Sequence, residues 1–446
     1  MSEKKFGKKE WMVLVLFGLV GQIAWSVENM YFNLFVFETV APSLETVTLM
    51  VQLSGIVATL ATLVAGTLSD KTGNRRSFIS FGYVIWGITV AMFGFLSPEL
   101  ADRLFDCGLD KAVSLTLVAV VVGDCVMTLF GSTANDACFN AWVTDNTQSS
   151  FRGKVEGVLS ILPLAAMLIV AGGFGIIVEI IGYSMMFLVL GIIISICGVC
   201  GMIKLKDSPT LRKSGGFADI LYGFKPSVIR GNSLFYLTLC LVLIYGIACQ
   251  IFMPYLIIYM KTFLGFSVLE YSIVFGGAII LGAAVNLYLT RLSDRKNKNR
   301  MLYFAAAIFS LGLLGMYFSK GASKATCLVT FGIAGFVMIT GYILISALCG
   351  SLVRDYTPEG EVGKLQGVRM VFSVLVPMIA GPMIGNAINA KMNIPLPDME
   401  SADVMTTQYI PAPEIFLAAS LFSLLMFALI PVLVKISKNK GNRENV

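Results

Sequence analysis

The chain has 446 residues, of which 57% are hydrophobic and 13% are charged, and its net charge is +6. Soluble domains carry roughly 25% charged residues, so this composition excludes a water-soluble protein. There is no histidine, which removes the commonest metal ligand and the usual proton shuttle near neutral pH. The sequence also offers no nucleophile–base pair, phosphate loop or metal cluster. We therefore expect neither an enzyme nor a bound cofactor.

Apolar segments follow one another along the chain, and each is long enough to cross a bilayer core of roughly 30 Å as a helix. The first is too long for the apolar part of a signal peptide and has no small-residue cleavage site, so we expect it to be retained. The sequence thus predicts an all-α membrane protein with twelve transmembrane helices, at 11–37, 46–68, 77–97, 112–136, 155–178, 182–203, 232–260, 269–290, 301–318, 325–350, 366–390 and 414–435.

A basic interruption at 204–231 divides the predicted helices into two groups of six. It carries apolar residues at helical spacing, which predicts an amphipathic helix on the membrane surface. We therefore expect an N-terminal six-helix bundle at 1–203, a linker at 204–231 and a C-terminal six-helix bundle at 232–446.

Basic residues are distributed unequally between the two sets of loops. One set, together with both termini, carries 27 of the 33 lysines and arginines. Because basic loops stay on the cytoplasmic side, both termini are predicted to be cytoplasmic, in the cell (inner) membrane. The positive net charge then needs no nucleic acid. The expected partners are the lipid bilayer and a small-molecule substrate, and we expect a monomer.

Two short patterns occur once in each half of the chain. Residues 68–71 read Leu-Ser-Asp-Lys, and residues 292–295 read Leu-Ser-Asp-Arg. Asp145 precedes a Gly-Lys pair by eight residues, and Asp355 does the same in the second half. The repeats predict two pseudo-symmetric bundles that face a shared substrate pathway.

The segment from Gly66 to Arg76 resembles the signature of the loop between helices two and three in the major facilitator superfamily. It departs at Asn74, where a basic residue is usual. The resemblance implies the major facilitator fold and secondary transport by alternating access. It also implies that Asp70 docks at the start of helix eleven. By the internal repeat, Asp294 is expected to dock at the corresponding place in the first half, the start of helix five.

Charged residues in these loops are predicted to form a cytoplasmic gate that breaks and re-forms during transport. The alternative is that they only anchor the loops in water and headgroups. The predicted gating residues are Asp70, Arg75, Arg76, Asp136, Asp145, Arg152, Glu156, Asp294 and Asp355.

Acidic residues within the predicted spans are expensive to bury and usually functional. Glu28, Asp124 and Asp136 have no lysine or arginine deep in any span to pair with, so a proton, a metal cation or a cationic substrate is the expected partner. On an α-helical wheel Asp124 shares a face with Thr128 and Asn135, and Asp136 lies about 120° away. The alternative for each acid is a hydrogen-bonded structural carboxyl.

Amides and a tyrosine add to the predicted cavity, because such groups suit a polar ring. The predicted substrate- and ion-binding residues are Glu28, Asn29, Asn33, Asp124, Thr128, Asn135, Gln250 and Tyr255.

The absence of a buried base disfavours anionic substrates. We expect a neutral, sugar-like solute moved together with a proton or sodium ion. A weak resemblance to glycoside–pentoside–hexuronide cation symporters is limited because helix two offers Gln52, Ser54 and Thr59 rather than acids. A proton-coupled drug efflux antiporter and a lysolipid or lipid flippase remain as alternatives.

Overall fold

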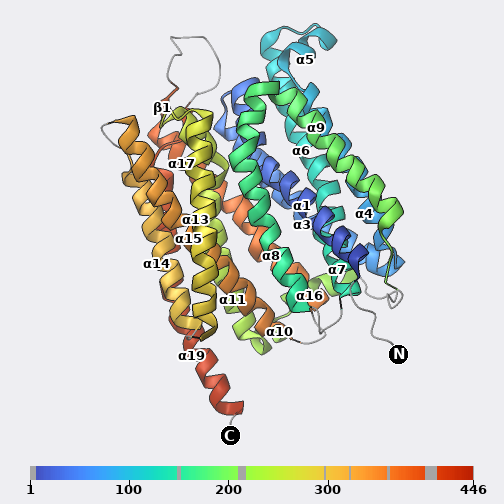
Figure 1. Ribbon diagram of the computed structural model, residues 1–446, viewed down its shortest axis with the longest axis vertical. Coiled ribbons are helices and arrows are strands. Elements are labelled where there is room, and N and C mark those ends of the chain that lie inside the picture. Colours follow the sequence, from blue (N-terminus) through green and yellow to red (C-terminus); the bar gives the residue numbers. More distant parts are fainter. Residues whose placement is uncertain are drawn as a thin grey trace. The chain divides into compact units, whose positions relative to one another are not determined.

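The computed structural model describes residues 7–147, 152–208, 217–295, 298–320, 323–358, 362–396 and 409–444, and these are almost entirely helical (Figure 1). They form two compact units. The N-terminal unit comprises Met1–Pro42 and Leu53–Phe217, and the C-terminal unit comprises Ser43–Gln52 and Ala218–Val446. The exact boundaries predicted for the two bundles and the linker stay a prediction.

The N-terminal unit contains long helices, several of which change to a wider π-helical turn partway along. Within it α1 lies beside α8, and α4 lies beside α9. Its elements are α1 (Lys8–Val27), η1 (Glu28–Phe32), α2 (Asn33–Phe35), η2 (Val36–Val40), α3 (Leu44–Thr72), α4 (Arg75–Met92), η3 (Phe93–Phe95), α5 (Pro98–Phe105), α6 (Leu109–Gly131), η4 (Ser132–Phe139), α7 (Asn140–Asn146), α8 (Arg152–Ile169), η5 (Val170–Phe174) and α9 (Gly175–Lys204). The first residues of α3 cluster with the other unit.

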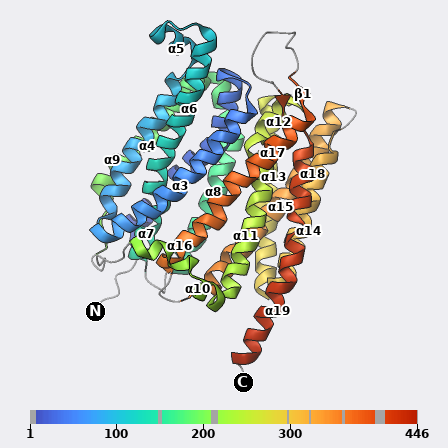
Figure 2. The same ribbon diagram turned by 180° about the vertical axis from the view of Figure 1, so that it is seen from behind.

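The C-terminal unit packs α13, α14 and α15 together, and α11 against α17 and α18 (Figure 2). A short antiparallel pair, β1 with β2, lies at one end. The elements are η6 (Phe217–Phe224), α10 (Pro226–Gly231), α11 (Ser233–Phe252), η7 (Met253–Tyr255), α12 (Leu256–Thr262), α13 (Val268–Arg295), α14 (Lys298–Phe318), α15 (Lys324–Tyr356), α16 (Val362–Met370), η8 (Val371–Leu375), α17 (Val376–Met392), β1 (Ile394–Pro395), β2 (Tyr409–Ile410), α18 (Glu414–Ser423) and α19 (Met426–Glu444).

The end of the predicted linker is folded onto this unit. Val228 of α10 is buried in an apolar cluster with Leu239 of α11 and Val368 of α16. Gly223 allows η6 to lie close to α16, because a Cβ at this position would lie 2.4 Å from a methyl group of Val368.

Helix length decides how many times the chain can cross a membrane. The described residues contain 11 helices long and apolar enough to do so, and one of them runs over the 48 residues Gly157–Lys204. A continuous helix of that length would extend about 72 Å, more than twice the bilayer core. At Gly182 the backbone leaves the helical region, with φ 75° and ψ 166°, so this segment makes two crossings. All twelve predicted spans therefore have a helical counterpart.

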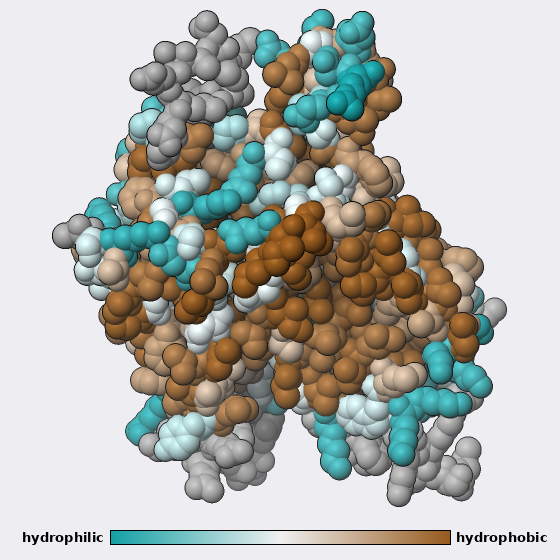
Figure 3. All heavy atoms as spheres, turned by 45° about the horizontal axis from the view of Figure 1, so that its top comes forward, coloured by the Kyte–Doolittle hydropathy of each residue, from teal (hydrophilic) through white to brown (hydrophobic). Residues whose placement is uncertain are grey.

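The outer surfaces of these helices are apolar. Figure 3 shows hydrophobic side chains over much of the visible face. Ile180 and Ile203 of α9 are hydrophobic residues with exposed fractions of 76% and 73%. Lipid chains are as apolar as these side chains, so van der Waals contact rather than the hydrophobic effect must hold the helices together.

Close helix contacts in both units depend on glycine. A Cβ at Gly87 of α4 would lie 2.3 Å from the carbonyl oxygen of Gly191 in α9. In the C-terminal unit, a Cβ at Gly341 of α15 would lie 2.5 Å from the backbone nitrogen of Phe309 in α14. These backbones touch, which gives the dispersion contact that membrane helices need.

Gly341→Ala is therefore expected to lower the free energy of unfolding by about 1–3 kcal/mol, because the backbones of α14 and α15 must separate. Gly335→Ala on the same helix is the matched control. Among the described residues, its own helix backbone apart, no atom lies within 4 Å of its added Cβ, and alanine is the better helix former by about 1 kcal/mol. Thermal unfolding in detergent compares the two variants. Equal melting temperatures would contradict the proposed glycine contact.

Candidate ion- and substrate-binding site

Glu28 and Asp124 lie together inside the N-terminal unit, although they come from different helices. Their exposed fractions are 8% and 2%. The hydroxyl of Thr128 donates a hydrogen bond to Oε1 of Glu28 at 3.1 Å. Glu28 also interacts electrostatically with Asp124 and Asp136. Glu28 thus lies in one cluster with two further acids, Asp124 and Asp136, and with Thr128. We call these four residues the acid cluster.

Two π-helical segments shape the acid cluster. Glu28 is the first residue of η1, and Asp136 lies inside η4. A π-turn holds more residues than an α-turn and so rotates each residue less. This brings Asp136 round towards the face of Asp124, whereas a regular α-helix would leave it about 120° away. The helical-wheel separation expected from the sequence is therefore wrong, and a gating role for Asp136 stays a prediction.

The two deepest carboxyl groups are incompletely bonded. Among the described residues, Oε2 of Glu28 and Oδ1 of Asp124 have no hydrogen-bond partner. The ion pairs recorded within the described residues include neither acid. An ionised carboxylate is costly to bury without a partner, so a proton or a bound cation must neutralise it.

Aromatic side chains form one wall beside this cluster. The rings of Trp25 and Trp86 lie 5.0 Å apart, and those of Tyr83 and Trp86 lie 5.4 Å apart. The Tyr83 hydroxyl bonds the carbonyl of Phe17 at 2.7 Å and Oδ1 of Asn135 at 3.0 Å. The wall thereby ties α1, α4 and η4 together. Sequence reasoning missed Tyr83 and Trp86, because α4 is apolar and carries no acid that would mark it.

Glycines make room for this wall. A Cβ at Gly21 would lie 2.7 Å from both Oδ1 of Asn135 and the Tyr83 hydroxyl. A Cβ at Gly131 would lie 2.8 Å from the Trp86 ring.

The predicted amides of the first helix lie close to the cluster in sequence but have their own bonds. Asn29 is exposed, and its amide donates to the carbonyl of Trp25 at 2.7 Å. Asn33 is buried, and its amide donates to the carbonyl of Asn29 at 3.1 Å. Both bonds are local to the helix. Substrate contact by either residue stays a prediction.

The predicted residues of helix seven lie in the C-terminal unit. Tyr255 is fully buried, and its hydroxyl contacts the carbonyl of Pro382 at 3.0 Å and the hydroxyl of Thr48 at 2.7 Å. Gln250 packs against Gly381, where an added Cβ would lie 2.3 Å from the glutamine Cβ. Both side chains contribute to packing, and their contact with substrate is untested.

The loop signature forms an ion-pair network inside the N-terminal unit. Arg75, whose side chain is 5% exposed, pairs with Asp70 and, at 3.1 Å, with Asp145. Its guanidinium also donates to the hydroxyl of Ser69. This network joins the end of α3 to the end of α7. Docking of Asp70 on helix eleven stays a prediction.

The structure describes the side chains of only some of the other predicted gating residues. The Arg76 guanidinium donates to the carbonyl of Met202, and its backbone N–H donates to Asp207 at 2.9 Å. The side chains of Arg152, Glu156 and Asp294 lie outside the described residues. Asp355 borders a separate pocket.

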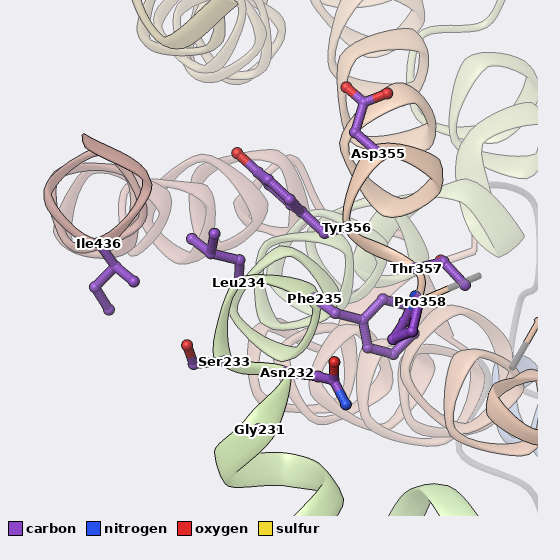
Figure 4. A pocket seen from close by; sticks show the side chains of 10 residues that line it. All are labelled: Gly231, Asn232, Ser233, Leu234, Phe235, Asp355, Tyr356, Thr357, Pro358 and Ile436. Carbon is purple, nitrogen blue, oxygen red and sulfur yellow. The ribbon is translucent and has the colours of Figure 1, made fainter. Parts of the chain in front are cut away.

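That pocket lies in the C-terminal unit, has a volume of about 520 Å³, and is shown in Figure 4. The start of α11 contributes Asn232 and Ser233, and the end of α15 contributes Asp355 and Tyr356. Of the predicted site residues, its lining includes Asp355. The pocket does not coincide with the acid cluster, which lies in the other unit.

Twelve apolar crossings and a buried acid cluster define a multi-pass membrane transporter. The sequence profile of the Major Facilitator Superfamily matches residues 14–382. The chain therefore belongs to this superfamily and is a transporter rather than an enzyme. No curated protein matches its sequence.

Three solved structures of similar fold are distant from this chain in sequence. The nucleoside transporter NupG is 14% identical with a TM-score of 0.62, and the match covers 95% of this chain and 98% of that one. A bacterial homologue of the human lysosomal transporter Spinster is 12% identical, with a TM-score of 0.67 and coverage of 97% and 98%. A bacterial homologue of the iron transporter ferroportin is 16% identical, with a TM-score of 0.64 and coverage of 96% and 98%. These likenesses establish the fold alone.

Proposed function

We propose that this transporter moves a small, neutral, polar solute across the cell membrane and couples its movement to a cation held by Glu28 and Asp124. The observation that carries the proposal is the buried carboxyl pair, in which each acid has an oxygen without a hydrogen-bond partner among the described residues. Neutralising this pair removes a large desolvation cost. Cation binding can therefore favour one conformational state over another, which is the requirement for coupling.

A proton is the simplest coupling cation. Metal cations require several oxygen ligands at fixed distances, and the described residues contain no group of three or more acids and cysteines arranged to hold one. A proton needs only a single carboxyl oxygen. The hydrogen bond from Thr128 to Glu28 leaves Oε2 of the same carboxyl available for it.

The character of the site favours an uncharged substrate. Amide and hydroxyl groups of Asn135 and Tyr83 lie beside the acids, together with two indole rings. Such a wall suits a ring with several hydroxyl groups, as in sugars.

The excess of basic residues in one set of loops supports cytoplasmic termini. We further propose a monomer that binds no nucleic acid.

Thermal unfolding of the purified protein in detergent tests this function against named compounds, because a ligand that binds only the folded state raises the melting temperature. The panel is glucose, xylose, maltose, uridine, adenosine, lactate, tetraphenylphosphonium and a lysophospholipid, each at two pH values in sodium chloride or choline chloride.

We expect a neutral sugar or nucleoside to stabilise the protein equally in both salts, and Asp124→Asn to change the pH dependence of that stabilisation. Stabilisation only in sodium chloride would replace the proton with sodium. A response restricted to tetraphenylphosphonium would favour drug efflux through the aromatic wall at Trp25 and Trp86. A response restricted to the lysophospholipid would favour lipid transport, and either would overturn the proposed substrate.

A further inference from the structure

Polar side chains recur every fourth residue along α6 and η4: Asp124, Thr128, Ser132 and Asp136. In a regular α-helix each step of four residues advances about 6 Å and rotates by about 40°, so such a row drifts around the helix. Here the change to π-helix begins at Ser132 and counters the drift. The four side chains consequently form one continuous polar row within an apolar span.

The row runs from the buried interior towards a more accessible end. Asp124, Thr128 and Ser132 have exposed fractions of 2%, 1% and 0%. Asp136 is partly exposed. Of the three clustered acids, Asp136 is therefore the most exposed.

Polar contacts link two members of the row to neighbouring acids, Thr128 to Glu28 and Ser132 to Asp136. Thr128 donates to Glu28 at 3.1 Å. At the other end the hydroxyl of Ser132, the indole N–H of Trp25 and the amide of Asn135 face the Asp136 carboxylate, the last at 3.4 Å. Within the described residues Ser132 Oγ and Trp25 Nε1 have no hydrogen-bond partner by geometry, so both polar groups face the carboxylate without bonding it. A buried hydroxyl that serves only packing would normally bond its own helix backbone.

We propose that Asp136, Ser132 and Thr128 form the path by which protons travel between water and the buried carboxyl groups of Glu28 and Asp124. This inference rests on the proposed proton coupling and adds its route. A hydroxyl has one donor and two acceptor sites. It can therefore take a proton from one side as it releases its own to the other, so that each O–H bond formed is matched by one broken. Only one positive charge moves, and no oxidant or co-reactant is needed.

Neighbouring elements contribute few other titratable groups to this path. Glu28 faces it from η1, Tyr83 from α4, and Cys125 from α6 itself. The electrostatic and hydrogen-bond partners recorded for the three acids, within the described residues, include no lysine or arginine. A proton on the path therefore meets no fixed positive charge.

The rate of proton arrival tests the path without any substrate. The infrared C=O stretching band of protonated carboxyl groups is followed in the purified wild-type protein after a rapid pH jump. Glu28→Gln and Asp124→Asn assign the band to its residues. We expect Ser132→Ala to slow the rise of the band about 100-fold or more, because positioned proton-transfer groups contribute factors of this size. Ser132→Thr keeps a hydroxyl and is expected to restore the rate. Asp136→Asn removes the most exposed acid of the path and is expected to slow it at least as much.

Ser114→Ala is the matched control, because Ser114 lies on the same helix, is exposed and, among the residues that the structure describes, bonds only the carbonyl of Asp110. We expect it to leave the rate unchanged. If the wild-type band does not respond to pH at all, the proposed proton coupling itself fails. If the band responds but Ser132→Ala and Asp136→Asn match the wild type in rate, the coupling stands and the path is wrong. A merely structural role for Ser132 would lower the melting temperature without slowing the band.

Discussion

Glu28→Gln is expected to reduce uphill transport about 100-fold or more, because loss of a positioned proton-transfer group has effects of this size. The amide keeps the shape of the side chain and can still accept the hydrogen bond from Thr128. The glutamine side chain cannot bind or release a proton, so position 28 stays neutral throughout transport. Substrate movement is then no longer linked to the proton gradient. The melting temperature is expected to stay the same or rise, because a buried ionisable group has been replaced by a neutral one.

Proteoliposomes give the measurement. Uptake of the neutral sugar or nucleoside that most stabilises the wild type is followed under an imposed proton gradient, together with the internal pH. Glu99→Gln is the control, since Glu99 is an exposed acid of α5 outside the spans. Unimpaired uphill uptake by Glu28→Gln would show that Glu28 is a structural carboxyl and that coupling does not depend on it.

Arg75→Met is expected to lower the free energy of unfolding by about 1–3 kcal/mol, because the buried guanidinium loses its hydrogen bonds to two carboxylates that are 42% and 25% exposed. The side chain of Arg75 is 5% exposed and pairs with both Asp70 and Asp145. Its removal leaves two carboxylates facing each other without a counter-charge. Arg75→Lys is expected to recover only part of the loss, because an ammonium group cannot reproduce the forked geometry of a guanidinium.

Unfolding in detergent measures this loss, and two further variants define its origin. Arg75→Met combined with Asp145→Asn should be more stable than Arg75→Met alone, because one uncompensated charge has gone. Arg76→Met should cost less than about 1 kcal/mol, as expected for an exposed charged group. Within the described part of the chain, its guanidinium donates a hydrogen bond to one backbone carbonyl, that of Met202. Similar losses in Arg75→Met and Arg76→Met would contradict the importance of the buried network.

The acid cluster shows where sequence reasoning succeeds and where it stops. Glu28, Asp124 and Thr128 could be named in advance because a polar residue in an apolar span carries a cost that only function or pairing explains. Their meeting could not be predicted, since it depends on where the fold places η1 relative to α6. Asp136 was assigned to another face because a helical wheel assumes a constant turn, and the π-helical segment η4 has no recognisable signature in the sequence.

Arg75 gives a second example of the same limit. The loop signature identified it as a charged gating residue, but its pairing with Asp145 joins positions 70 residues apart. Tyr255 was predicted from its residue type to bind substrate, whereas its hydroxyl is engaged with Thr48 and Pro382 in the C-terminal unit. Residue type indicates what a side chain can do, and packing decides which partner it meets.

The sequence by itself determined the membrane class, the twelve crossings and the superfamily. Each of these depends on local properties, because the thickness of the hydrocarbon layer sets the length and polarity of every span independently of its neighbours. Only the tertiary structure decided that Glu28 lies beside Asp124, that Thr128 donates a hydrogen bond to Glu28, and that Arg75 bridges two aspartates. Contacts between helices in lipid arise from close packing at glycines and from local changes in helical turn, and neither follows from hydropathy.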